Sequence, residues 1–131
     1  MGEERPGCPE HVLGRLIGDL KRWGALFLEV ARSRDHPALE QVLGGLAEWM
    51  GNDLIDGWLY LPIPAFEQLS DRSEELFQVC RGYVEQLRRA PAALPEGERR
   101  SLEGAIAAVL DRVRGLGAGP RGQQASGEPG R

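Results

Sequence analysis

The sequence predicts an all-α protein: an antiparallel four-helix bundle with a short extra helix, or an irregular segment broken by proline, between the second and third long helices. Three observations support this prediction. Large apolar residues recur in steps of three and four over four long stretches, as they do along the buried side of an amphipathic helix. The proline residues fall at the ends of these stretches and not inside them. A chain of 131 residues that is 41% hydrophobic and 27% charged is typical of one globular domain.

The first helix is predicted over 9–34. It begins at Pro9, because proline is favoured in the first turn of a helix, and it ends before Pro37. Its apolar stripe contains Leu13, Leu16, Leu20, Trp23, Phe27 and Val30. Three further apolar residues widen this stripe: Val12, Ile17 and Leu26.

The second helix is predicted over 37–50. Its apolar stripe contains Leu39, Val42, Leu46 and Trp49. Gly51 and Asn52 then form a stop signal, because both residue types favour the left-handed conformation that ends a helix. The chain restarts as a short helix over 53–61.

The third helix follows a segment that is broken by proline. Pro62 and Pro64 end the short helix and impose an extended stretch, after which 65–69 form a single helical turn. Ser70 is a suitable N-cap, so the third long helix is predicted over 70–90. Its apolar stripe contains Leu76, Cys80, Tyr83 and Leu87.

The fourth helix is predicted over 96–116. Its apolar stripe contains Leu102, Ile106, Val109, Val113 and Leu116. Residues 117–131 are rich in glycine and have no apolar pattern, which predicts a disordered tail. With a flexible N-terminal tail over 1–8, the bundle forms a single domain over 9–116.

Charge is distributed unevenly along the chain. The formal net charge is −4, but residues 35–75 hold nine acidic residues against a single arginine. Residues 11–34 and 81–114 carry net charges of +3 and +2. Two interpretations remain open. Either the basic first and fourth helices lie beside the acidic middle and offset it, or the acidic middle is a face for a basic partner.

The segment around the prolines is the predicted binding surface, because it cannot pack as a regular helix. An apolar groove there would receive a helix or an extended peptide from a partner. The residues predicted to bind are Trp49, Trp58, Tyr60, Leu61, Ile63, Phe66, Asp53 and Asp56. The alternative for the tryptophans is packing in the core. We therefore predict a non-enzymatic protein–protein interaction module, an adaptor, regulator or chaperone-like protein, that binds another polypeptide or itself.

Two other functions are alternatives. The first is an all-α metal-dependent nucleotide hydrolase, in which paired carboxylates on facing helices hold Mg²⁺. Its ligands would be Asp53, Asp56, Glu74 and Glu75. The second is a nucleic-acid accessory protein, although the net negative charge argues against it. The arginines available for that function are Arg15, Arg22, Arg32, Arg34, Arg88, Arg89, Arg99 and Arg100.

No motif for catalysis, metal binding or membrane insertion is present in the sequence. It has no His-Glu-x-x-His motif and no phosphate-binding glycine loop, so we predict no catalytic residue, no resident metal and no cofactor. Without a secretory signal or a long apolar run, we expect a soluble cytoplasmic protein that does not bind membranes. Cys80 is predicted to be a small buried apolar residue. Four helical glycines could allow close helix packing or reflect base composition alone: Gly14, Gly18, Gly44 and Gly45.

Overall fold

The computed structural model describes residues 9–33, 36–89 and 94–127, with side chains for 10–33, 37–89 and 94–116. All the regular structure within these ranges is helical, as predicted. The elements are α1 (Pro9–Ser33), α2 (His36–Trp49), η2 (Met50–Leu54), α3 (Ile55–Gly57), α4 (Ile63–Arg89) and α5 (Glu96–Gly127). Of these, η2 is a π-helical turn that directly continues α2.

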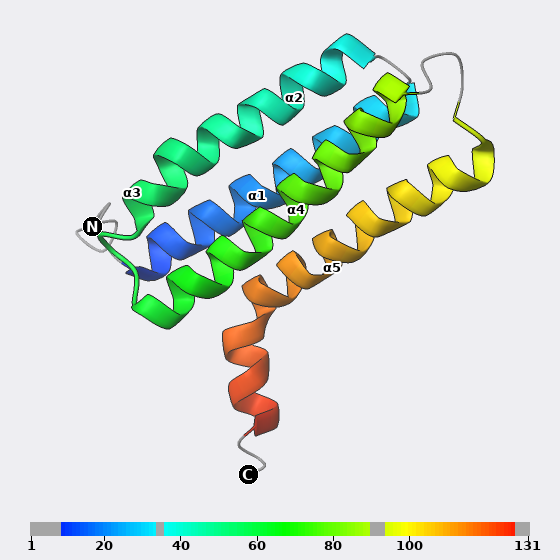
Figure 1. Ribbon diagram of the computed structural model, residues 1–131. Coiled ribbons are helices and arrows are strands. Elements are labelled where there is room, and N and C mark those ends of the chain that lie inside the picture. Colours follow the sequence, from blue (N-terminus) through cyan, green and yellow to red (C-terminus); the bar gives the residue numbers. More distant parts are fainter. Residues whose placement is uncertain (1–8, 34–35, 90–93, 128–131) are drawn as a thin grey trace.

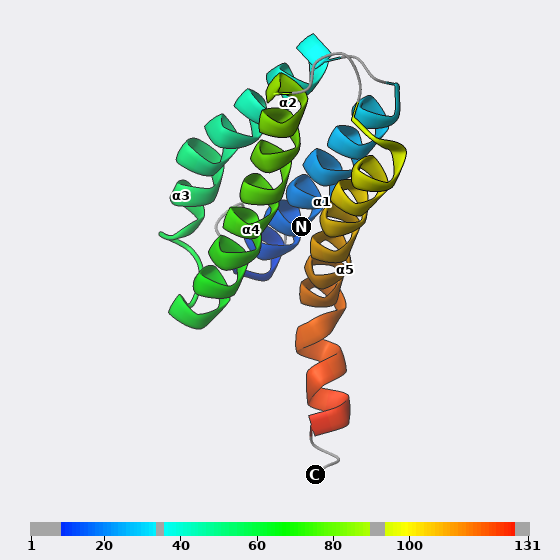
Figure 2. The same cartoon turned by 45° about the vertical axis from the view of Figure 1, so that its right-hand side comes forward.

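The four long helices form the predicted antiparallel bundle (Figure 1). Helices α1 and α4 run in one direction, and α2 and α5 run in the opposite direction. In chain order, α1 packs on α2, α2 on α4 and α4 on α5, and α5 packs back against α1. The helices therefore surround a single core, and the turned view shows the same arrangement (Figure 2).

The predicted apolar stripes meet in this core. Fully buried side chains come from all four long helices: Leu16, Leu20, Phe27, Leu39, Leu46, Leu76, Cys80, Tyr83, Ile106, Val109 and Val113. Cys80 is a free buried thiol, as predicted, and burial raises its pKa. Leu26 was expected to widen the stripe of the first helix, but it is 41% exposed.

The helical path continues where a break was predicted. Gly51 and Asn52 do not end the second helix, because both lie inside η2. The residues that flank η2 keep right-handed helical dihedral angles, so the chain forms a widened turn and does not reverse direction. This continuation carries Leu54 into the core, where it is only 2% exposed. The short helix predicted over 53–61 is therefore the end of a longer helical path.

Helix α4 begins earlier than predicted. Its first residue is Ile63, so Pro64 lies in the first turn, where its missing N–H is not required. The predicted start at Ser70 is wrong, and the separate turn predicted over 65–69 belongs to the same helix. Leu69 gives the physical reason, because it is fully buried and extends the apolar stripe of α4 toward its start.

Helix α5 extends beyond its predicted end at Leu116 and reaches Gly127. The part coloured from orange to red projects away from the other helices (Figures 1 and 2). The hydrogen bonds of a helix are local, so a helix can continue beyond the last residue that packs on a neighbour. The predicted tail over 117–131 is therefore helical as far as Gly127. The predicted N-terminal tail over 1–8 lies outside the described residues, as do residues 128–131.

Two glycines allow neighbouring helices to pack closely. A Cβ atom on Gly45 would lie 2.5 Å from the ring of Trp23, and one on Gly24 would lie 2.4 Å from a leucine of α5. Both distances are shorter than van der Waals contact, so a larger residue would displace these side chains or push the helices apart. Close packing was one of the two alternatives for Gly45, and Gly24 was not considered. Three other glycines from the prediction make no such contact: Gly14, Gly18 and Gly44.

Candidate protein-binding surface

The chain passes from α3 into α4 at one end of the bundle (Figure 1), and large apolar side chains of this segment are exposed. Six such side chains are exposed among the described residues, and five of them lie within nine consecutive positions. We call these five the apolar turn: Ile55, Trp58, Leu59, Tyr60 and Ile63. Their exposed fractions range from 47% for Tyr60 to 71% for Leu59. Such a concentration of exposed apolar side chains is typical of an interaction site.

Gly57 determines which way the apolar turn faces. Leu54 and Leu61 are buried, and Gly57 is the buried residue between them. A Cβ atom on Gly57 would lie 2.5 Å from Cδ1 of Leu16, so the chain here lies directly on α1. Trp58 is the next residue, and each helical residue is rotated by about 100° from the one before it. Because Gly57 faces inward, Trp58 falls on the solvent side.

Backbone hydrogen bonds order the apolar turn. The N–H of Trp58 donates to the carbonyl oxygen of Ile55 at 3.0 Å. The N–H of Tyr60 donates to the carbonyl oxygen of Gly57 at 2.9 Å. Pro62 follows, and its ring fixes the backbone at the entry to α4. A surface that is ordered before association loses less conformational entropy when a partner binds.

The structure separates the predicted binding residues into two groups. Trp58, Tyr60 and Ile63 are exposed and belong to the apolar turn. Trp49 and Leu61 are only 6% and 7% exposed. These two residues are part of the core, so their assignment to the binding surface is corrected.

Trp49 is buried because its polar atom has a partner inside the protein. Its Nε1–H donates to Oδ2 of Asp19 on α1 at 3.0 Å. The same carboxylate is held by Arg22 and lies 3.9 Å from Arg15. Core packing, the alternative interpretation of the tryptophans, is therefore correct for Trp49 and does not apply to Trp58.

The remaining predicted residues lie beside the apolar turn. Phe66 is partly buried against the core. Asp53 is exposed and lies 4.0 Å from Arg15, and Asp56 is exposed inside the turn.

The exposure of Ile55 and Leu59 could not be predicted, because apolar residues at 54, 55, 58 and 59 form one face of a predicted helix. The residue that could have indicated which side faces the core is Gly57, because it lies between Leu54 and Leu61, which are both buried.

Carboxylates without ion-pair partners lie next to the apolar turn. Glu67 and Asp71 follow Ile63 at intervals of four residues, which places all three on one exposed face of α4. Like Asp56, neither carboxylate forms an ion pair within the described part of the chain. The apolar turn is therefore bordered by negative charge that favours a basic partner.

Other acidic residues of the region 35–75 are offset by basic residues on neighbouring helices. Glu40 on α2 accepts a hydrogen bond from Arg88 on α4 at 3.2 Å. Glu75 on α4 accepts one from Arg112 on α5 at 3.3 Å. The interpretation that neighbouring helices offset the acidic region is therefore correct for the carboxylates between helices. A basic partner for the carboxylates beside the apolar turn stays a prediction.

The carboxylates suggested for a hydrolase are not gathered into one cluster. Among the described residues, no group of three or more His, Cys, Asp or Glu side chains could hold a metal ion. Glu75 also lies 3.4 Å from Arg72. Most of the arginines considered for nucleic acid binding contact carboxylates of this chain: Arg15, Arg22, Arg32, Arg88, Arg99 and Arg100.

In the ranges that the structure describes, no helix is both long enough and apolar enough to cross a membrane. Comparison of the chain with protein-family models, with curated proteins and with solved structures finds no match.

Proposed function

We propose that this protein is a non-enzymatic interaction module that binds a partner polypeptide through the apolar turn. The observation that supports this function is the exposure of five large apolar side chains on a segment that its own hydrogen bonds order. Each Å² of apolar surface removed from water contributes roughly 25 cal/mol, so a partner that covers this segment gains affinity from burial. An ordered backbone reduces the entropic cost of that binding.

The partner that fits is a basic segment with apolar anchors, such as an amphipathic helix that carries lysine or arginine on its polar side. Its apolar side chains would cover Trp58 and Leu59. Its basic side chains would lie near Asp56, Glu67 and Asp71, which are exposed. Such charge pairs set the orientation and the association rate more than the affinity, so we expect capture to weaken as salt is added.

A photoreactive side chain at the apolar turn tests this function. Leu59 is replaced by p-benzoylphenylalanine, and Leu26, the exposed leucine of α1, is replaced in a matched variant. After irradiation in the native lysate, we expect a discrete crosslinked partner from position 59 and none from position 26. Equal products from both positions, or none from position 59, would contradict the proposal. A product that contains only this chain would assign the surface to self-association and contradict a separate partner.

Substitutions then measure how much the apolar turn contributes to the affinity for the partner. Trp58→Ala and Leu59→Asp should each weaken partner capture at least tenfold, because central aromatic and apolar contacts dominate binding energy. Helicity by circular dichroism should stay unchanged, since both side chains are more than half exposed. Leu26→Asp is the matched control and should capture normally. Normal capture by both test variants would show that the partner binds elsewhere.

A further inference from the structure

A pattern of eight residues occurs twice, once in α1 and once in α5. Residues 25–32 are ALFLEVAR, and residues 107–114 are AAVLDRVR. Both segments place alanine first, leucine fourth, a carboxylate fifth and arginine eighth. Because α1 and α5 are antiparallel and pack together, the two segments run in opposite directions away from the place where their alanine ends lie side by side. The surface between them therefore has an approximate twofold symmetry in residue type.

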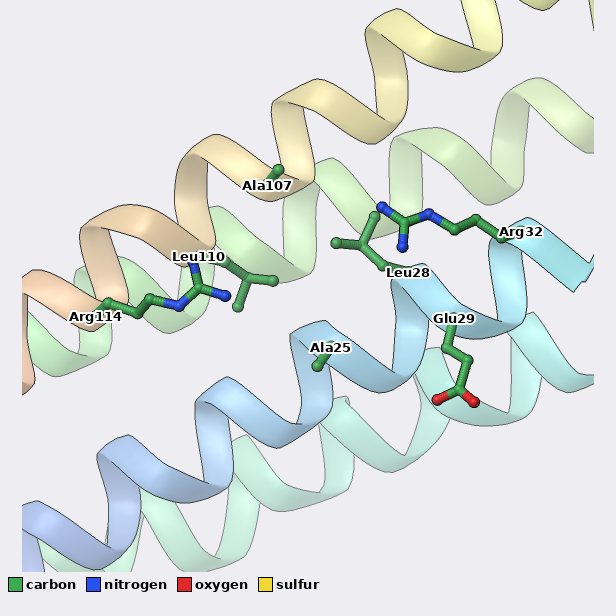
Figure 3. Close-up of a pocket in the computed structure, with 7 residues that line it drawn as sticks. All are labelled: Ala25, Leu28, Glu29, Arg32, Ala107, Leu110 and Arg114. Carbon is green, nitrogen blue, oxygen red and sulfur yellow. The ribbon is translucent and has the colours of Figure 1, made fainter.

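The two segments enclose a hollow of about 530 Å³ on the outer face of the bundle (Figure 3). Its floor is apolar, because it includes the buried side chains of Leu28 and Leu110. Ala25 and Ala107 also line it, and their short side chains leave the space open to solvent. A hollow of this size falls within the range that small-molecule sites occupy.

An arginine stands at each end of the hollow. Figure 3 shows Arg32 and Arg114 reaching toward each other from opposite ends, over the two leucines. Each arginine has one described carboxylate contact: Nε of Arg32 lies 3.9 Å from Glu103, and Nη1 of Arg114 lies 2.8 Å from Asp111. A guanidinium has five N–H donors, so each retains donors for a ligand. Glu29 also lines the hollow, but its carboxylate points away from the leucines.

We propose that this hollow binds an elongated apolar molecule with an anionic group at each end, of the chemical class of the long-chain dicarboxylates. The apolar chain would lie on the two leucines, and each carboxylate would meet one arginine, whose planar fork matches carboxylate geometry. Each arginine lies seven residues, or about 10 Å, beyond the alanine of its own helix. Because the helices are antiparallel, the two arginines start at opposite ends of the hollow and reach inward over the leucines. We therefore expect that a short diacid cannot meet both guanidinium groups and also cover the leucines.

This site is separate from the apolar turn, since α1 and α5 contribute no residue to that surface. The probe is sebacate, a ten-carbon dicarboxylate, titrated into the ¹⁵N-labelled full chain. We expect saturable amide shifts that are concentrated in 25–32 and 107–114. Succinate, which is too short, should give no saturable shift. Decanoate, which has the same carbon number and one carboxylate, should bind about threefold to fivefold more weakly, the effect of one exposed ion pair.

Matched variants locate the ligand. Ala107→Leu fills the hollow and should weaken sebacate binding at least tenfold, whereas Ala108→Leu, on an exposed neighbouring position, should not change it. The double variant Arg32→Gln, Arg114→Gln should weaken binding about tenfold, whereas Arg100→Gln, on the exposed surface of α5, should not. The proposal would be overturned by equal binding of decanoate and sebacate, by unsaturable shifts, or by an Ala107→Leu protein that binds as the wild type does.

Discussion

One end of the bundle covers its aromatic and charged side chains, and the opposite end leaves large apolar side chains exposed. At the end where α1 and α4 finish, the rings of Phe27 and Tyr83 meet edge to face with centroids 5.8 Å apart, and both are fully buried. Beside them, Arg99 and Glu103 form an ion pair at 2.9 Å with side chains that are only 17% and 14% exposed. We call this the closed end. At the opposite end, the apolar turn leaves Trp58 58% exposed.

This difference shows that exposure follows from position in the fold and not from residue type alone. Charged side chains are seldom covered unless they are paired, and the charges at the closed end are paired. The apolar turn is uncovered because Leu54, Gly57 and Leu61 already occupy the inward positions around it. Stability should therefore depend strongly on the closed end and weakly on the apolar turn, and three measurements test this comparison.

The largest effect is expected from Phe27→Ala at the closed end. It removes a fully buried ring and its edge-to-face contact, and such a change lowers the free energy of unfolding by about 3–5 kcal/mol. Leu59→Ala at the apolar turn should change it by less than about 0.5 kcal/mol, because the side chain is exposed. Urea unfolding followed by circular dichroism gives both values. Comparable losses of unfolding free energy in the two variants would contradict the proposed difference between the two ends.

An intermediate effect is expected from Gly57→Ala. The new Cβ would lie 2.5 Å from Cδ1 of Leu16, a fully buried side chain that would have to shift within the core. We expect a loss of about 1–3 kcal/mol, together with weaker partner capture because the turn is displaced. Gly44→Ala is the control, since nothing lies within 4 Å of its added Cβ, and it should gain about 0.5–1 kcal/mol. Unchanged stability and capture in Gly57→Ala would refute the role given to this glycine.

The smallest effect concerns pH. Burial raises the pKa of Tyr83, the charge of Glu103 raises it further, and Arg99 opposes the shift. The folded state therefore keeps the phenolic proton to a higher pH than the unfolded chain, in which tyrosine titrates at about pH 10. Tyr83 should not make stability pH-dependent below that value, and it should lower stability as the pH rises through the folded pKa. Tyr83→Phe should reduce this loss of stability at high pH, measured as the free energy of unfolding in chemical denaturation, and Tyr60→Phe should not.

The bundle itself could be predicted from the sequence, because steps of three and four depend only on helix geometry. Leu16, Leu20 and Phe27 are buried where the spacing of the first helix places them. The stop signal at Gly51 and the N-cap signal at Ser70 predicted helix ends that the structure does not have. Their local preferences were outweighed by the burial of core residues a few positions away, which favours continuous helices.

The exposed apolar segment could be predicted only in part. Trp58, Tyr60 and Ile63 are exposed in the segment that the nearby prolines indicated, since prolines disturb helix packing. The burial of Trp49 depends on Asp19, thirty residues earlier in the chain, which no local pattern reveals. The hollow between α1 and α5 was missed for the same reason, because its two halves lie on helices that are distant in sequence.

The π-helical turn η2 sets the rotational phase of everything between it and Pro62. A π-turn takes up one residue more than an α-helical turn, and one residue corresponds to a rotation of about 100°. If the same residues formed regular α-helical turns, Gly57 would rotate by about 100° away from α1 and Asp56 would take its inward position. The widened turn therefore decides which residue of this segment meets α1, and with it which side chains remain exposed.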